Sequence, residues 1–508
     1  MLSKVFTGAV MGINGLVMEV EVDIAKGLPA FSTVGLPEAA VRESRERVKS
    51  AIVNCGYEFP DDRITVNLAP AGIKKEGTGF DLPIAAGILA AAGIVPQGAS
   101  DPWLLLGELA LDGRIKPVSG CLPVAAAAKE AGFSGVLIPY ENRREAAVVE
   151  GLNVFPVSGL SEAVDFLRGQ RDIEVQPHEA FYDPETDLET EADFSEVAAQ
   201  HHVKRALEIA AAGAHNVLMT GPPGSGKTML ARRFAGIVPP MTFEEALETT
   251  KIFSVAGLID KDQALVARRP FRSPHHTVSD AGLVGGGNVP RPGEVSLAHK
   301  GVLFLDELPE FKKSVLEVLR QPLEQGKVTI SRASVSLSYP ADFTLIAAMN
   351  PCPCGYYSDP VHACRCSSAQ IGRYRNRLSG PLLDRIDIHV DVPAVAYADL
   401  ASQKPAESSA DIRRRVMSAR RTQEKRFKRT GVNTNAVMKN RHIKKYCVLD
   451  GESGDILEKA ADRLGLSARA CHRVLKIART IADLDGAPEI GPPHILEAVG
   501  YRSLDRAF

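Results

Sequence analysis

A glycine-rich segment at residues 221–228 carries the clearest chemistry in this 508-residue chain. It reads Gly221-Pro222-Pro223-Gly224-Ser225-Gly226-Lys227-Thr228 and matches the pattern G-x-x-x-x-G-K-[ST] in full. A strand pattern precedes it and a helix pattern follows it, so backbone amides and the helix N-terminus would surround phosphate oxygens. Lys227 would reach the outer phosphates, and Thr228 would offer its hydroxyl to Mg²⁺. The segment therefore predicts ATP and Mg²⁺ binding, whereas a chance glycine-rich turn would lack this context.

Two adjacent carboxylates follow the apolar run at residues 301–305. A buried strand of this kind would deliver Asp306 and Glu307 to its carboxyl end, where ligands of α/β proteins bind. Asp306 would hold the Mg²⁺, and Glu307 would polarise the attacking water as general base. The alternative is an ordinary acid pair at a strand end, and the phosphate loop upstream disfavours it.

Asn350 and Arg385 are two further candidates for a catalytic role. Asn350 ends a strand pattern, and an amide at that place can orient water beside a γ-phosphate, although Asn before Pro is also a common turn residue. An arginine placed against a neighbour's γ-phosphate can raise the rate of hydrolysis by about 10³–10⁵. A lone arginine such as Arg385 is more often part of a surface ion pair, so its type alone does not assign the role.

Four cysteines lie close together in the sequence between these two residues: Cys352, Cys354, Cys364 and Cys366. Two close pairs separated by a short loop suit tetrahedral Zn²⁺, although the C-x-C spacing is tighter than the usual C-x₂-C. His362 is an alternative ligand, and free thiols in a loop are the alternative to a metal site. The eight cysteines of the chain are too few and too scattered for a disulfide framework.

The chain is expected to be a multidomain protein of the α/β and α+β classes. Residues 1–168 alternate between strand and helix patterns, and residues 169–196 form an acidic linker. Residues 197–395 form an α/β core with buried parallel strands at 216–220, 301–306 and 343–349. Residues 396–508 begin with a polar stretch and continue as a helical lid bundle.

Composition limits the locations and partners to be expected. Hydrophobic residues make up 45% and the formal net charge is −2, as in an ordinary globular protein. We find neither a membrane-spanning run nor a secretory signal, and therefore expect a cytoplasmic protein. Residues 411–445 contain thirteen Lys or Arg and two acids, so this helical stretch would attract a phosphate backbone without reading its sequence. A solvated helix face is the alternative.

The motifs taken together resemble a known family. GPPGSGKT, FLDE, MNP and LLDRID, with Ser467-Ala-Arg469 near the C-terminus, are similar to the AAA+ superfamily and its magnesium-chelatase-like clade. Residues 269–287, 291–311 and 474–486 extend the resemblance to the ComM/YifB family over essentially the whole chain.

This resemblance implies specific roles. Val197 and Gln200 would line the adenine pocket, and Asn350 would be sensor 1. Arg385 would be an arginine finger that acts on a neighbouring subunit, and Arg469 would be sensor 2, reaching back from the helical lid to the nucleotide. A finger acting between subunits requires a ring or filament, and the family implies a homo-hexamer.

The N-terminal region, residues 1–168, resembles the Lon protease domain, which has the ribosomal-protein S5-like fold. Our alignment places Gly79 at the position of the nucleophilic serine and Leu122 at that of the lysine. Neither side chain can attack a carbonyl or accept a proton, so we expect no proteolysis.

Two functions of different classes remain. The family resemblance favours an ATP-driven hexameric helicase that migrates branched DNA in recombination and natural transformation. The alternative is a magnesium-chelatase-like motor that remodels a protein partner.

Overall fold

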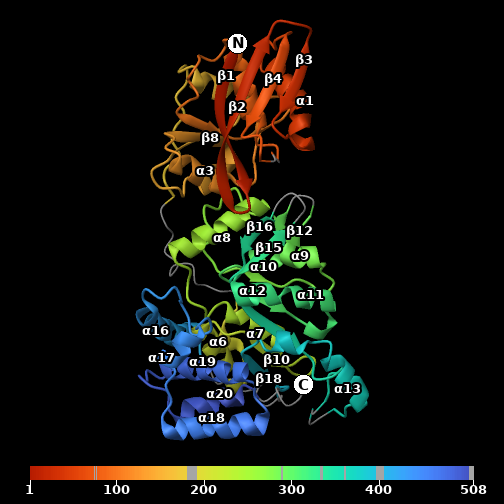
Figure 1. The fold of residues 1–508 in the computed structure, drawn as a ribbon, viewed down its shortest axis with the longest axis vertical. Coiled ribbons are helices and arrows are strands. Elements are labelled where there is room, and N and C mark those ends of the chain that lie inside the picture. Colours follow the sequence, from red (N-terminus) through yellow and green to blue (C-terminus); the bar gives the residue numbers. More distant parts are fainter. Residues whose placement is uncertain are drawn as a thin grey trace.

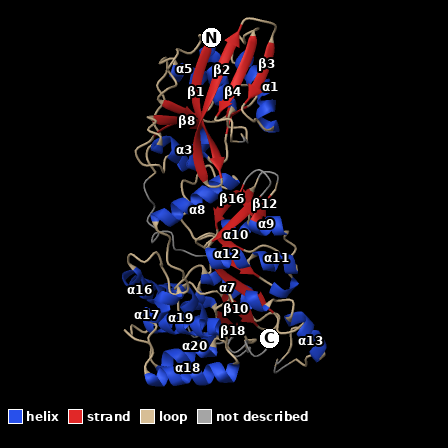
Figure 2. Cartoon of the chain, in the orientation of Figure 1, coloured by secondary structure: helices blue, strands red, loops and turns tan. Residues whose placement is uncertain are grey.

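The computed structural model describes all residues except 74, 76, 180–191, 288–289, 332–335, 358, 360–361, 396–405 and 503–508. The chain is elongated, with three parts arranged along its long axis (Figure 1). A sheet-containing N-terminal part lies at one end, an α/β core lies in the middle, and a purely helical part packs against the core at the other end (Figure 2). The described helices include none that combines the length and hydropathy needed to cross a bilayer.

The N-terminal part is built on a seven-stranded mixed sheet. In sheet order its strands are β3 (Ala30–Val34), β4 (Arg63–Ala69), β2 (Asn14–Ala25), β1 (Leu2–Met11), β5 (Trp103–Leu105), β8 (Gly135–Pro139) and β9 (Asn153–Val157). Its helices are α1 (Ala39–Asn54), α2 (Asp81–Ala91), α3 (Cys121–Glu130), α4 (Arg143–Ala146) and α5 (Leu160–Leu167). Helix α2 is buried along its whole length because it packs against β1, β2 and α1. Gly87 permits that approach, since a Cβ there would lie 2.7 Å from a Val22 methyl group.

The core is a five-stranded sheet in which every pairing is parallel. In sheet order its strands are β11 (Phe271–Arg272), β14 (Val302–Leu305), β17 (Thr344–Met349), β10 (Val217–Thr220) and β18 (Ile388–Asp391). Three short hairpins accompany the two sheets: β6–β7 (Glu108–Leu109, Ile115–Lys116), β12–β13 (Gly285–Gly286, Arg291–Pro292) and β15–β16 (Lys327–Ser331, Ser336–Pro340). Because the core strands are parallel, the carboxyl ends of β10, β14 and β17 meet at one edge.

Helices of the core and of the C-terminal part share one hydrophobic cluster. The core helices are α6 (His201–Gly213), α7 (Lys227–Phe234), α8 (Phe243–Ala256), α9 (Asp280–Val284), α10 (Glu294–Leu297), α11 (Lys313–Val318), α12 (Arg320–Gln325), α13 (Ser368–Arg375) and α14 (Gly380–Leu383). The C-terminal helices are α16 (Ser409–Phe427), α17 (Asn440–Tyr446), α18 (Gly451–Leu464), α19 (Ala468–Leu484) and α20 (Pro492–Gly500). Helices α16 and α19 pack directly on α6, so the helical part forms a continuous core with the sheet.

Both described ends of the predicted acidic linker are attached to folded parts. Gln176 donates its backbone N–H to Val154 in β9 at 2.9 Å, which extends the N-terminal part past residue 168. Phe194 is fully buried in the core cluster, and Asp193 accepts a hydrogen bond from the backbone N–H of Ser409. The core therefore begins near residue 193, because an aromatic side chain there contributes to its packing.

Helix α3 of the N-terminal part packs against α8 of the core. The backbone N–H of Gly120 donates to the Ser254 carbonyl at 2.9 Å, and Arg144 donates to the Asp262 carbonyl at 2.8 Å. Leu122, Val148 and Leu265 form a small buried apolar cluster across the contact. The two parts are therefore joined by specific packing as well as by the linker.

Candidate nucleotide-binding site

The glycine-rich segment forms the turn between β10 and α7, as its spacing predicts. Gly224 and Gly226 have φ angles of +75° and +88°, a left-handed conformation that side chains with a Cβ rarely adopt. Helix α7 begins at Lys227, so its N-terminal backbone groups face the inside of this turn, which we call the P-loop (residues 221–228). This arrangement places the positive end of a helix dipole where phosphate oxygens would lie.

The Lys227 ammonium group lies at the centre of the P-loop. It donates to the carbonyl oxygens of Gly221 at 2.8 Å and Pro222 at 2.9 Å, and to the Asn350 side-chain oxygen at 3.3 Å. Burial lowers the pKa of Lys227, while the nearby carboxylates of Asp306 and Glu307 raise it. An ammonium group held by weak neutral acceptors is well suited to exchange them for phosphate oxygens, so the donor set fits a triphosphate.

Thr228 and Asp306 meet beside the lysine. The Thr228 hydroxyl donates to Asp306 Oδ2 at 2.7 Å, and Asp306 Oδ1 accepts the backbone N–H of Glu307 at 2.9 Å. A hydroxyl and a carboxylate oxygen are the hard ligands that Mg²⁺ prefers. Only β17 lies between β14, which carries Asp306, and β10, which leads into the P-loop. Thr228 and Asp306 therefore fit a magnesium site next to the phosphates.

Glu307 follows directly and is held in an unusual conformation. Its φ angle is +52°, which turns the side chain away from the strand direction and leaves it 55% exposed. Its carboxylate lies 3.6 Å from Nδ1 of His276. A backbone that departs from the favoured region at this place is typical of a catalytic residue, so the geometry is compatible with the expected general base.

Gln200 borders the P-loop, whereas Val197 belongs to the core. The Gln200 side chain is buried and donates to the carbonyl oxygens of Ser225 at 2.9 Å and Pro393 at 3.2 Å. Its side-chain oxygen has no hydrogen-bond partner among the described residues. The Val197 side chain is buried in the hydrophobic cluster. Of these two expected adenine contacts, the structure therefore brings Gln200 to the loop.

Arg385 lies at the opposite edge of the sheet from the P-loop. Its carbonyl accepts the Asn216 side-chain amide at 3.0 Å, and Asn216 stands at the start of β10, whereas the P-loop follows its end. The guanidinium group is buried and pairs with Glu324 on α12. Arg385 is therefore out of reach of the P-loop in its own chain.

Arg469 is also placed away from the P-loop of its own chain. It is exposed in the first turn of α19, one turn before Arg473, which pairs with Asp387 at the start of β18. Near the other end of α19, Asp485 pairs with Arg205 in α6 at 3.3 Å. The end of α19 therefore lies on the side of the sheet that carries the P-loop, and its start, with Arg469, lies on the opposite side. In this structure Arg469 therefore lies away from the P-loop of its own chain, because α19 packs in this direction.

Comparisons with known proteins give the same family as the motifs. Family profiles described as "Subunit ChlI of Mg-chelatase", "Magnesium chelatase, subunit ChlI" and "Magnesium chelatase, subunit ChlI C-terminal" match residues 20–142, 193–400 and 406–502. The chain is 45% identical to a YifB protein of Salmonella typhimurium over 506 residues, which is 99% of this chain and 98% of the relative. It is 44% identical to competence protein ComM of Haemophilus influenzae, with the same coverage. The chain belongs to the ComM/YifB family of magnesium-chelatase-like AAA+ proteins. Membership of this family indicates an ATPase that uses Mg²⁺.

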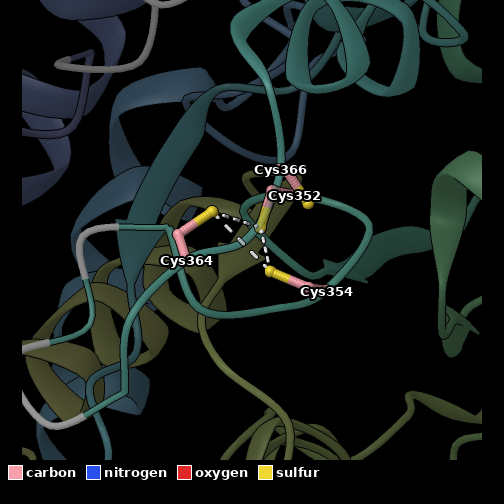
Figure 3. A group of neighbouring side chains, drawn as sticks. All are labelled: Cys352, Cys354, Cys364 and Cys366. Carbon is pink, nitrogen blue, oxygen red and sulfur yellow. Dashed lines mark hydrogen bonds between the residues drawn. The ribbon is translucent and has the colours of Figure 1, made fainter.

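The four clustered cysteines of this ComM/YifB chain come together in space (Figure 3). The sulfur atoms of Cys352, Cys354 and Cys364 are 3.4–3.7 Å apart, and all four sulfurs lie within 4.8 Å of one another. Backbone N–H groups of neighbouring residues lower the pKa of Cys354 to about 6. A disulfide needs about 2.05 Å between sulfurs, whereas four thiolates about 2.3 Å from one zinc lie about 3.8 Å apart. The spacing is compatible with zinc.

The N-terminal part is similar to a Lon protease, and the two residues that our alignment places at its catalytic positions have packed surroundings. Lon protease 2 of Bacillus subtilis is 29% identical over 175 residues, which is 31% of each chain. A Cβ at Gly79 would lie 2.9 Å from Leu106, so even a serine would require a shift there. Leu122 is fully buried in the apolar contact with the core. The residue that our alignment places at the lysine position of the protease therefore lies in an interface between two parts of the chain.

Truncation of Leu122 tests this interface. Leu122→Ala should lower the free energy of unfolding by about 2–5 kcal/mol, because it leaves a cavity between α3 and the core. Leu111→Ala removes the same atoms from a side chain that is 56% exposed and should cost far less. Denaturant titration of both variants measures the difference. Equal losses would show that the contact contributes nothing to stability.

The basic C-terminal stretch divides into internal and exposed residues. Four of the thirteen Lys and Arg residues, all in α16, bind residues outside that helix: Arg413 the Gly236 carbonyl, Arg415 Glu208 and Glu407, Arg420 the Ala211 carbonyl and Arg426 Asp483. Two more make local contacts, Arg414 with Asp411 and Arg441 with His442. These two and the remaining seven are exposed: Arg414, Arg421, Lys425, Lys428, Arg429, Lys439, Arg441, Lys444 and Lys445. The stripe expected from the sequence is therefore smaller in the structure, because part of its charge holds α16 to the core.

Three residues that contact expected site residues were not themselves expected from the sequence. His276 lies beside Glu307, Glu324 holds Arg385, and Gly355 packs on the P-loop residue Pro223. Each contact joins segments that are distant in the sequence. The sequence offers a local signal for two of the three, the doubled histidine at residues 275–276 and the place of Gly355 directly after Cys354, whereas Glu324 has ordinary surroundings.

Proposed function

We propose that this chain is an ATP-hydrolysing motor that acts on DNA, with branch migration in recombination and natural transformation as its activity. The observation that supports it best is the convergence of Lys227, Thr228, Asp306 and Asn350 at one edge of the parallel sheet. Lys227 would bind the outer phosphates, Thr228 and Asp306 would hold Mg²⁺, and Glu307 would accept a proton from the attacking water. Asn350 would orient that water.

The proposed active form is a homo-hexameric ring. Arg385 and the start of α19 lie on the side of the sheet opposite the P-loop, so neither can serve the site of the same chain. A head-to-tail contact would place this side of one subunit against the P-loop of the next, and such heterologous contacts close into a ring. Arg385 and Arg469 would then act as the finger and sensor 2 of a neighbouring site. This arrangement accounts for both placements.

DNA is the proposed substrate for two reasons. A relative that shares nearly the whole length of the chain is named a competence protein. Nine exposed basic residues lie in the α16–α17 region, defined above, and such a density of positive charge would attract a phosphate backbone. A motor that remodels a protein partner, as proposed for the magnesium-chelatase type, would need no such patch.

We also propose a structural Zn²⁺ at the four cysteines. The cytoplasm, which we propose as the location, keeps thiols reduced, so a cluster of this spacing would hold a metal there in preference to a disulfide. Three of the sulfurs are 3.4–3.7 Å apart and all four lie within 4.8 Å of one another, so small adjustments would give a tetrahedral site.

ATPase turnover with and without DNA tests the proposal. Branched DNA should stimulate turnover, and the triple variant Lys425→Ala, Lys428→Ala, Arg429→Ala should lose stimulation and DNA affinity. For each phosphate that is no longer neutralised, the slope of log affinity against log salt should become shallower by about 0.9. The control removes three exposed basic residues elsewhere: Lys26, Arg168 and Lys459. ATP hydrolysis without DNA binding or stimulation would favour a protein client.

A further inference from the structure

The loop that carries the cysteine cluster rests directly on the P-loop. Gly355 lies between Cys354 and the rest of the loop, has a φ angle of +85° and packs on Pro223. A Cβ at position 355 would lie 2.5 Å from Cδ and 2.8 Å from Cγ of Pro223. Only a glycine can occupy this place without moving the P-loop, because both the space and the backbone conformation exclude a side chain.

The same loop is attached to the nucleotide site a second time, at the point where it begins. It leaves β17 through Asn350, whose side chain accepts the Lys227 ammonium hydrogen bond at 3.3 Å. The Met349 carbonyl accepts the Gly221 N–H at 3.2 Å, and the Pro351 carbonyl accepts Arg375 Nε at 3.3 Å. Cys352 is therefore two residues from a side chain that holds the P-loop lysine. The cluster is linked to the P-loop both through the chain and across space.

We infer that metal binding at the four cysteines positions the P-loop for nucleotide, and that Gly355 and Pro223 transmit the effect. This inference rests on the proposed ATP site and on the proposed zinc. The described residues of the loop between Cys352 and Cys366 form no helix or strand, so the cysteines are its main cross-link. Without a metal, only the weak thiol contacts of 3.4–3.7 Å among Cys352, Cys354 and Cys364 would hold this part of the loop, and the turn at Gly355 would open. Pro223 would then lose its contact with Gly355. The backbone amides of the P-loop would no longer be held in a fixed arrangement.

The ligand atoms of the cysteine cluster determine which metal it would bind. Soft thiolate ligands in a tetrahedral set select Zn²⁺ over Mg²⁺, so the cluster and the phosphate site bind different metals from one solution. Zinc occupancy would change the affinity for nucleotide, while Mg²⁺ would remain bound by oxygen ligands at Thr228 and Asp306. Gly355 is a positioning residue, because it contacts the loop that binds phosphate and has no side chain to contact nucleotide.

The test measures zinc content and the affinity of a fluorescent ATP analogue in excess Mg²⁺, with the full-length chain. We expect about one zinc per chain, and about a tenfold drop in nucleotide affinity after a zinc-selective chelator, restored by added Zn²⁺. Gly355→Ala should retain zinc and bind the analogue about tenfold more weakly, as expected when the support of a binding loop is displaced. Gly431→Ala is the matched control, since Gly431 has a φ angle of +69° and nothing within 4 Å of its Cβ position.

The possible outcomes distinguish a failure of the inferred coupling from a failure of the proposed ATP site or zinc site. Equal nucleotide affinity with and without zinc, or an unaffected Gly355→Ala variant, overturns the coupling and leaves the ATP site intact. A wild-type chain without zinc overturns the metal site and the coupling together. A wild-type chain that does not bind the analogue overturns the proposed ATP site itself. Zinc-dependent affinity in the wild type, with a specific defect in Gly355→Ala, supports the inference.

Discussion

Replacement of Lys227 by alanine is expected to abolish ATP hydrolysis, with turnover reduced by about 10²–10³ or more, as for the loss of one preorganised charged donor. The Lys227 ammonium is the only cation that the described residues place within the P-loop, and it makes four hydrogen bonds there. Without it, the negative charge that develops on the phosphates has no direct counter-charge from the protein. Phosphate release measured under saturating ATP and Mg²⁺ gives the result.

The matched control is Lys261→Ala, which removes the same side chain from an exposed position outside the site. It should retain wild-type turnover and melting temperature. Lys227→Ala should melt within a few degrees of the wild type, because its ammonium group contacts only the P-loop and Asn350. Retention of more than about a tenth of the activity in a folded Lys227→Ala protein would mean that the P-loop is not the site of hydrolysis.

The parts of the site that lie at strand ends could be predicted from the sequence. The expected strands at 216–220, 301–306 and 343–349 are confirmed as β10, β14 and β17, within one residue at each end. Short apolar runs bounded by glycine or polar residues specify buried parallel strands, and parallel strands bring their carboxyl ends to one edge. The proximity of Thr228 and Asp306 therefore followed from local patterns and a general rule of sheet geometry.

Contacts between distant segments could not be predicted in this way. The packing of Leu122 on Leu265, of Gly355 on Pro223 and of Phe194 in the core depends on how whole elements are oriented. No periodicity of a single segment carries that information. The orientation of α19 is a further case, since its amphipathic pattern predicts a buried face but leaves open which end lies near the P-loop. The sequence therefore could not show on which side of the sheet Arg469 lies.

Arg385→Ala should leave nucleotide binding near the wild-type value and reduce hydrolysis by about 10³ or more. The residue lies at the edge of the sheet opposite its own P-loop, so it cannot contribute to binding there. In a ring, its guanidinium would stabilise the charge that develops in the site of the neighbouring subunit. Glu324→Gln is the companion variant, because it removes the charged partner of Arg385 and leaves the arginine in place. It should retain hydrolysis, whereas an equal loss would indicate a purely structural role for the pair.

Mixing of two inactive variants tests whether Arg385 acts between subunits. A chain with Arg385→Ala has an intact P-loop, and a chain with Lys227→Ala has an intact arginine on the opposite edge. In a mixed ring, an intact P-loop meets an intact arginine wherever the two chains adjoin in the correct order, so part of the hydrolysis should return. An arginine that acted within its own chain would give no recovery at any ratio, since every subunit would still lack one of the two groups. The recovered hydrolysis should follow the fraction of contacts between unlike chains, and the mixing ratio sets that fraction. The same titration therefore reports on the head-to-tail order of the assembly.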